Sequence, residues 1–151
     1  QLPDASPLRK RLGEMGLATF PMATGGKGVH VIASLDGSAD WGAVKDFASR
    51  FARAVAEAHP KRFTANMRKA ERKGRIFLDW LRNERGATAV MPYSARAREV
   101  SAVAAPITWD ELAELKDARP FHIDDAAELV ARARGKELRD WCRIAQPLPR
   151  I

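Results

Sequence analysis

A glycine-rich segment near the N-terminus has the residue types that can hold a phosphate group. Residues 24–28 read TGGKG, and a β-branched run with His30 follows them. Glycines let backbone N–H groups approach a phosphate closely, and Lys27 can add a positive charge. The segment is not a Walker A loop, which needs G-x-x-x-x-G-K-[ST] before a helix. Taken alone, the segment is more typical of a hairpin turn with an exposed lysine. His30, taken alone, is more typical of a structural histidine that forms hydrogen bonds.

A single carboxylate, Asp79, interrupts the apolar run RIFLDWL of residues 75–81. Burying a carboxylate is costly unless it is paired with a cation or binds a metal ion. Two interpretations follow from the residues. Asp79 is either a metal ligand, or it faces solvent or pairs with Arg72 or Arg75.

The chain just before this run is strongly basic. Residues 67–75, MRKAERKGR, contain five cationic side chains: Arg68, Lys69, Arg72, Lys73 and Arg75. Such a cluster binds phosphates in a salt-sensitive manner, although a charge run is more often a solvated face. A further basic pair, Arg96 and Arg98, follows a P-Y-S turn.

Other kinds of chemistry are poorly supported. Cys142 has no histidine nearby in the sequence, and Ser94 lies outside any nucleophile-elbow motif. The three histidines, His30, His59 and His122, do not have the spacing of metal ligands. Core packing explains the positions of the four tryptophans at 41, 80, 109 and 141, so we do not interpret them as base-stacking platforms.

The composition is that of a basic globular chain. Its 151 residues include 26 Lys and Arg against 19 Asp and Glu, a net charge of +7, and 46% are hydrophobic. The charge favours a polyanionic partner, and the hydrophobic share argues against disorder. No apolar run is long enough for a membrane helix, and the N-terminus does not resemble a signal peptide. A lone cysteine excludes an internal disulfide and suits a reducing cytoplasm. The first residue, Gln1, indicates that upstream sequence is missing.

The elements that must position these side chains form one compact α/β unit in our prediction. Ser6 caps a short helix that Gly13 or Gly16 ends, and strands at 17–23 and 29–35 flank the TGGKG turn. Asp40 caps an amphipathic helix that starts at Trp41 and is ended by Pro60. Two more strands are expected at 75–81 and 87–91, the second after a turn at 83–86.

Two helices are predicted in the C-terminal third. Thr108 and Glu111 have the T-x-x-E spacing of a capping box, which starts a helix from Trp109 to about Lys116. Asp124 or Asp125 caps a last helix that ends near Gly135.

Three segments together resemble a known family. In this order and spacing, TGGKGVHV, MRKAERKGRIFLDWLRNERGATAVMPYSARAR and PITWDEL resemble the polymerase domain of bacterial ATP-dependent DNA ligase D. That domain is the end-joining branch of the archaeo-eukaryotic primase superfamily. The similarity runs from the first helix to about Arg134, and the central block is long and specific.

The resemblance implies a fold and a set of site residues. The fold would be α/β (α+β), an RRM-like sheet with helices packed on one face, and Asp79 and His30 on the other face with Lys27 at its rim. Nucleotide and phosphate contacts fall on Thr24, Lys27, His30, Arg72 and Arg96, with Thr24 replacing the family's usual serine. Asp79 corresponds to the third metal-site carboxylate, and Arg68, Lys69, Lys73 and Arg75 are weaker candidates for DNA contacts.

The family also implies cofactors and partners. Two divalent ions, Mn²⁺ or Mg²⁺, would bind an NTP or dNTP and activate a primer 3′-hydroxyl. Expected partners are DNA ends, a ligase domain and an end-binding protein in the bacterial cytoplasm at the nucleoid, with no membrane.

One departure from the family limits this prediction. Its first two metal carboxylates form an Asp-x-Asp motif, and no two acidic residues of this chain lie two positions apart. We therefore expect residues 1–151 to be a single partial domain, the C-terminal portion of the family domain, that is inactive alone. The alternative is a non-catalytic module that binds nucleotides or DNA ends.

Overall fold

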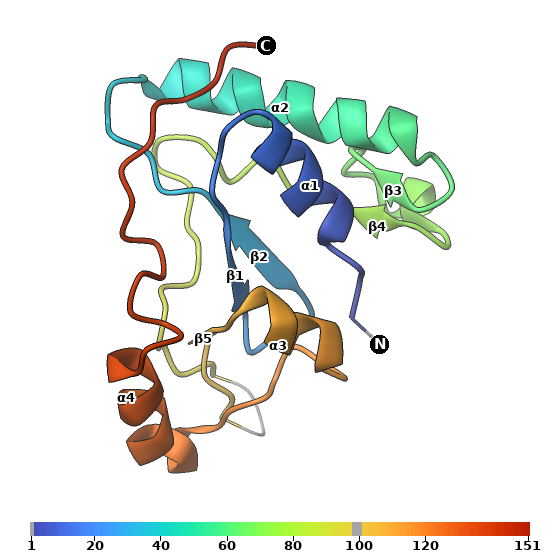
Figure 1. Ribbon diagram of the computed structural model, residues 1–151. Helices are drawn as coiled ribbons and strands as arrows, with labels where there is room; N and C mark the ends of the chain where they lie inside the picture. Colours follow the sequence, from blue (N-terminus) through green and yellow to red (C-terminus); the bar gives the residue numbers. More distant parts are fainter. Residues whose placement is uncertain (1, 98–100) are drawn as a thin grey trace. The chain divides into compact units, whose positions relative to one another are not determined.

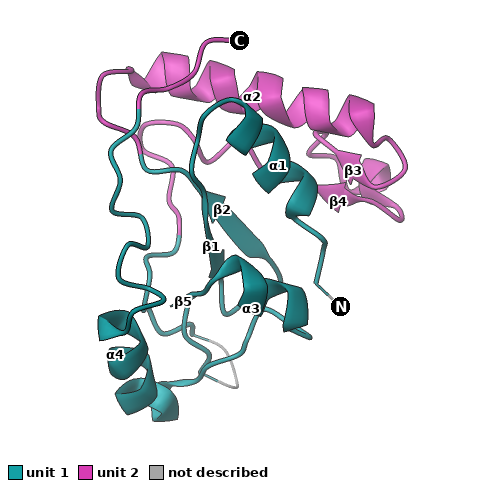
Figure 2. Cartoon of the chain, in the orientation of Figure 1, with its two compact units in different colours: residues 1–34, 90–146 teal, residues 35–89, 147–151 magenta. Residues whose placement is uncertain are grey.

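The computed structural model describes residues 2–97 and 101–151. The chain forms two compact units, residues 1–34 with 90–146 and residues 35–89 with 147–151 (Figure 2). Each unit contains helices and strands, so the predicted mixed α/β class is confirmed. Among the described residues, no helix combines the length and the apolar character that crossing a membrane requires.

The first unit is built on a three-stranded antiparallel sheet in the order β2-β1-β5 (Figure 1). Strand β1 (Phe20–Ala23) pairs with β2 (Val29–Ile32) as a hairpin around the TGGKG turn, as predicted, although both strands are shorter than expected. Strand β5 (Ala105–Pro106) pairs with the other edge of β1.

The register of this sheet separates its two faces. Directly opposite residues of an antiparallel pair point to the same face, so Ala23 shares a face with Val29 and Ala105, and Met22 shares the other with His30. Ala23 packs in one apolar cluster with Leu112 of α3 (Trp109–Glu114), and Ala105 in another with Leu129 of α4 (Ala126–Arg134). The helices α3 and α4 therefore cover the face opposite to His30.

Local side-chain chemistry sets the ends of the helices. The capping box of α3 is confirmed, because Glu111 N donates to Thr108 Oγ1 at 3.1 Å and Thr108 N donates to Glu111 Oε1 at 2.9 Å. Helix α1 (Ser6–Glu14) begins at Ser6 rather than after it, and Gly16, with φ of 90°, follows its end. Asp125 precedes α4, but its carboxylate accepts from His122 N at 2.8 Å instead of capping α4.

A half-buried ion pair joins α3, α4 and β5. Arg132 Nη1 lies 2.7 Å from Glu111 Oε2, and Nη2 lies 3.0 Å from Glu111 Oε1. Nη2 also donates to the carbonyl of Pro106 at 3.3 Å, and the guanidinium lies over the ring of Phe121. One arginine therefore fixes both helices to the edge strand of the sheet.

A buried glutamine holds the outer ends of the hairpin. Gln146 Oε1 accepts from Ala18 N at 2.6 Å, and Gln146 Nε2 donates to the carbonyls of Ala18 and Ser34 at 3.0 and 3.2 Å. These bonds satisfy backbone groups just before β1 and just after β2, where the strand pairing ends.

The second unit contains the long amphipathic helix α2 (Trp41–Ala58). Its boundaries agree with the prediction, and Asp40 Oδ1 accepts from Ala43 N at 2.8 Å as the expected cap. The buried residues of the helix are Phe47, Phe51, Ala52 and Val55. Trp41, at the start of the helix, is 56% exposed, so the prediction that core packing explains its position is wrong.

The strands of the second unit are much shorter than predicted. Strands β3 (Phe63–Thr64) and β4 (Ile76–Phe77) form a two-stranded parallel sheet, and the short helix η1 (Lys69–Arg72) lies in the connection between them. The prediction of a strand over residues 75–81 is therefore wrong beyond β4. Leu78 N still donates to Thr64 O at 2.9 Å, but Asp79 then accepts from Leu81 N and turns the chain.

The strand predicted at 87–91 is absent from the described structure. Ala87 N donates to Glu84 O in the preceding turn, and the side chain of Met91 is 71% exposed. Without a partner strand, the residues of this segment stay irregular.

The ion pair leads to a pH-dependent prediction for stability. Burial by itself raises the pKa of Glu111, but the hydrogen bonds from Arg132 and the Thr108 backbone outweigh it and hold the pKa below the ordinary value of 4.5. A carboxylate whose pKa is lower in the native state contributes stability above its unfolded-state pKa and loses it as the pH falls through the native value. We expect Glu111→Gln, which keeps a residue suited to the capping box, to lower the free energy of unfolding by about 1–2 kcal/mol at neutral pH.

Urea unfolding across the acid range checks this prediction. The difference between wild type and Glu111→Gln should begin to shrink below about pH 4.5, where the unfolded chain becomes protonated at this position, and should disappear once the pH is below the lowered pKa of native Glu111. The exposed Glu114 on the same helix gives the matched control, since Glu114→Gln should change little at any pH. A difference that does not change with pH would contradict the role of the charge.

Candidate functional site

The TGGKG turn is closed by the side chain of Thr24. Its Oγ1 donates to Gly28 O at 2.7 Å and accepts from Gly26 N at 3.2 Å, and Thr24 is only 7% exposed. The single hydroxyl proton is therefore used inside the turn. A direct phosphate contact by Thr24 stays a prediction, and it would need this proton to leave Gly28 O.

The structure brings Arg96 against this turn from a distant part of the sequence. Arg96 N donates to Ala102 O at 2.7 Å, and a bridge between Ala95 and Val103 continues the pairing. The Cγ atom of Arg96 lies so close to Gly25 that a Cβ atom at Gly25 would be 2.9 Å from it. Two predicted phosphate-binding segments of the first unit are thus in contact.

This part of the first unit has an excess of positive charge. Lys27 is exposed in the turn, and Arg96 is half-buried with its Cγ atom against Gly25 of the same turn. Among the described residues, no acidic side chain forms an ion pair with either cation. Two neighbouring cations without acidic partners attract an anion. His30 follows in β2, half-buried and on the sheet face that α3 and α4 leave uncovered.

Arg72 lies in the second unit, and its guanidinium is held by local contacts. Nη2 donates to the carbonyl of Met67 at 2.9 Å, and the guanidinium carbon lies 4.2 Å from the centre of the Phe77 ring. Its Nε is buried and has no hydrogen-bond partner among the described residues. Stacking on a ring of β4 fixes the plane of the guanidinium, which suits a directional contact with an anion.

Asp79 is a solvent-facing carboxylate just after β4. Its side chain is 43% exposed, Oδ1 accepts from Leu81 N at 3.2 Å, and Oδ2 lies 3.6 Å from Arg82 Nε. The interpretation that Asp79 faces solvent fits this position. The partner predicted for the ion pair is wrong, because Arg82 takes that place, while Arg75 pairs with Glu71 at 3.5 Å.

The prediction that Asp79 and His30 project from one sheet face also needs correction. His30 lies in β2 of the antiparallel sheet, whereas Asp79 follows β4 of the separate parallel sheet. The chain turns at Asp79 before a longer strand can form. Among the described residues, no group of three His, Cys, Asp or Glu side chains could hold a metal ion, so Asp79 as a metal ligand stays a prediction.

The basic segment forms the connection between β3 and β4. Arg68, Lys69 and Lys73 are exposed around η1, whereas Arg75 is half-buried and paired with Glu71. A short 3₁₀ turn thus presents three cations to solvent, and their contact with DNA stays a prediction.

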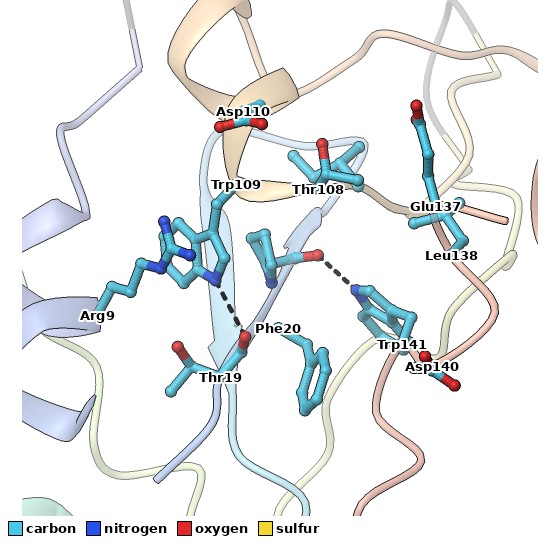
Figure 3. Close-up of a pocket in the computed structure, with 12 residues that line it drawn as sticks. Arg9, Thr19, Phe20, Thr108, Trp109, Asp110, Glu137, Leu138, Asp140 and Trp141 are labelled. Carbon is cyan, nitrogen blue, oxygen red and sulfur yellow. Dashed lines mark hydrogen bonds between the residues drawn. The ribbon is translucent and has the colours of Figure 1, made fainter. Parts of the chain in front are cut away.

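Sequence reasoning missed a pocket in the first unit, of about 300 Å³ (Figure 3). Trp109 and Trp141 line it, and their indole N–H groups donate to the carbonyls of Thr19 at 3.0 Å and Pro21 at 2.9 Å. Arg9 lies over the ring of Trp109. The indoles thus donate to carbonyls just before β1 and near its start, which no spacing in the sequence indicates.

Comparison with known proteins identifies the family. Residues 3–137 match the family described as LigD, primase-polymerase domain. The chain belongs to this family, which confirms the resemblance drawn from its motifs.

Individual relatives agree with this assignment. The chain is 36% identical over 140 residues to the multifunctional non-homologous end joining protein LigD of Pseudomonas aeruginosa, covering 93% of this chain and 16% of that protein. It is 38% identical over 124 residues to the protein of the same description from Mycolicibacterium smegmatis, covering 82% and 16%. The solved polymerase domain of Mycobacterium tuberculosis ligase D in complex with DNA matches with a TM-score of 0.82 and 34% identity, over 93% of this chain and 48% of that one. The chain thus spans about half of that solved polymerase domain.

The contacts of Thr24 predict how the turn tolerates substitution. Thr24→Val keeps the shape of the side chain but leaves Gly26 N and Gly28 O with fewer partners in a buried setting, and should lower the free energy of unfolding by about 1–3 kcal/mol. Thr24→Ser retains the hydroxyl and should be nearly neutral. Urea unfolding measures both, and equal stability of the valine and serine variants would show that the hydroxyl does not hold the turn.

Proposed function

We propose that this chain is part of the polymerase domain of a DNA end-joining repair protein, which adds nucleotides to a primer 3′ end at a DNA break. The observation that carries the proposal is the contact between the TGGKG turn and Arg96, which gathers two cations without acidic partners among the described residues. Membership of the LigD primase-polymerase family supports it, as does the similarity to a polymerase domain in complex with DNA.

On this proposal the two compact units are parts of one partial domain. The family match over residues 3–137 supports this, because it includes all of the long segment 35–89 that dominates the second unit. The antiparallel sheet would be this chain's share of an RRM-like sheet. Its helices α3 and α4 cover the face opposite to His30.

The cationic residues would bind the nucleoside triphosphate, an NTP or dNTP. Lys27 and Arg96 are suited to the phosphates by charge, and Arg72 by its fixed plane. In the transfer, the primer 3′-oxygen bonds to the α-phosphorus and pyrophosphate leaves. Positive charge near these groups stabilises the negative charge that develops on the phosphates.

Divalent ions, Mn²⁺ or Mg²⁺, would supply further charge neutralisation, with Asp79 as one ligand. The described residues do not form a metal site by themselves, because they contain no cluster of three possible ligands. The 151 residues also contain no Asp-x-Asp sequence. On this proposal the cations of this chain bind and orient the phosphates, and Asp79 supplies one of the metal ligands.

The exposed basic residues around η1, namely Arg68, Lys69 and Lys73, with Arg75 beside them, would contact the DNA backbone. The partners on this proposal are a template-primer at a DNA end, a ligase domain and an end-binding protein. The activity would take place at the nucleoid, in the bacterial cytoplasm.

Replacement of Asp79 tests the enzymatic role. In the full-length protein that carries this segment, Asp79→Asn should reduce metal-dependent nucleotide addition by about 100-fold or more, because a metal ligand is lost. Primer extension on an end-joining substrate measures the effect. The exposed Asp124 gives a control with the same change of charge, and Asp124→Asn should retain activity. Activity that survives in Asp79→Asn would overturn the assignment.

The alternative function is a binding module without catalysis. Two observations favour it: the absence of a three-ligand cluster among the described residues and the absence of Asp-x-Asp from the 151 residues. Such a module would still hold a nucleotide or a DNA end through Lys27, Arg72 and Arg96. The two functions differ in whether the full-length protein extends a primer.

DNA binding can be measured on this chain directly. Fluorescence anisotropy with a 5′-phosphorylated duplex over a series of salt concentrations should show affinity that falls steeply with salt. The double variant Lys69→Ala, Lys73→Ala should reduce the slope of log K against log salt by up to about 2, at about 0.9 for each lost phosphate contact. No binding at low salt would contradict both functions for this segment.

A further inference from the structure

Gly25 is the point at which the TGGKG turn touches the segment that carries Arg96. Its φ is 73°, and its N–H donates to Ala118 O at 2.8 Å. A Cβ atom at Gly25 would lie 2.9 Å from Arg96 Cγ, 3.1 Å from Val103 C and 3.2 Å from Val103 O. The first distance is shorter than a carbon–carbon contact allows, so a side chain here must displace something.

The backbone on each side of this contact is held by hydrogen bonds. Thr24 closes the turn, and Val103 N donates to Phe121 O at 3.0 Å. The backbone segment that carries Arg96, residues 94–96, is paired with residues 102–104. Ala104 N donates to Ser94 O at 2.9 Å, and Arg96 N donates to Ala102 O at 2.7 Å. When a Cβ atom fills the space at Gly25, the flexible side chain of Arg96 therefore moves more easily than the hydrogen-bonded backbone around it.

We propose that Gly25 is a positioning residue for phosphate binding. Because Gly25 has no side chain, the aliphatic part of the Arg96 side chain lies directly against the turn. The Arg96 guanidinium then binds the same anion as Lys27. The inference rests on the proposed function and deepens it. Gly25 has no charge of its own, yet on this inference the placement of Arg96 relative to Lys27 depends on the absence of a Cβ atom at Gly25.

A double-mutant cycle on this chain tests the proposal. Isothermal titration with inorganic triphosphate should show that Gly25→Ala and Arg96→Ala each weaken binding, by about 10-fold or more for a lost charged hydrogen bond. In the Arg96→Ala background, Gly25→Ala should weaken binding much less than it does in the wild type, because the side chain that it displaces is gone and only the contacts with the Val103 backbone remain. Additive losses would overturn the proposal, since Gly25 would then act without Arg96.

Two glycines of the same unit provide matched controls. Gly13 lies in α1, outside the turn, and a Cβ atom there would meet nothing within 4 Å. Gly16 has φ of 90° and equally open space, so Gly16→Ala introduces backbone strain without a contact. Both variants should bind triphosphate as the wild type does. Weaker binding by Gly16→Ala, comparable to that of Gly25→Ala, would attribute the effect to strain alone and overturn the proposal.

A measurement without ligand separates this proposal from the proposed function. The Nε–Hε resonance of Arg96, assigned by its loss in Arg96→Ala, should shift in Gly25→Ala and stay in place in Gly13→Ala. If wild type fails to bind triphosphate while this resonance shifts, the positioning holds and the phosphate-binding function fails. If the resonance does not move, the positioning itself is wrong.

Discussion

The first unit depends on the ion pair between Glu111 and Arg132. The same carboxylate that starts α3 receives two hydrogen bonds from an arginine of α4, and that arginine also binds the carbonyl of Pro106 in β5. The two side chains are only 29% and 19% exposed, so losing either partner would leave the other charge poorly compensated. The pair therefore helps keep α3 and α4 on one face of the sheet and leaves the His30 face clear of them.

This constraint extends to the candidate site through backbone pairing. Residues 102–104 lead directly into β5, which contains Pro106. Residues 102–104 also pair with residues 94–96, the backbone segment that carries Arg96. The position of residues 94–96 relative to the TGGKG turn is thus set by β5, and Arg132 holds β5 against α3 and α4. The charge arrangement at the turn is a consequence of strand pairing rather than of the charged residues themselves.

Short-range interactions explain which features the sequence could predict. The capping box of Thr108, the cap at Asp40 and the hairpin around TGGKG each depend on residues within a few positions, so residue types and spacing in the sequence predict all three. The strand expected at 75–81 is reduced to β4, and the strand expected at 87–91 does not form, because a strand needs a partner that its own residues cannot specify. For the same reason, family motifs named Lys27 and Arg96, but only the tertiary structure shows Gly25 between their segments.

The character of Asp79 divides the proposed chemistry into two parts. A carboxylate that is 43% exposed and 3.6 Å from its arginine partner keeps oxygen atoms available to a cation, yet one carboxylate does not hold two divalent ions. Cations such as Lys27 and Arg96 attract a polyphosphate without any metal, because they have no acidic partner among the described residues. Binding and catalysis therefore make different demands on this chain. The cations of this chain are suited to binding phosphates. Catalysis requires more carboxylates than the described structure brings together.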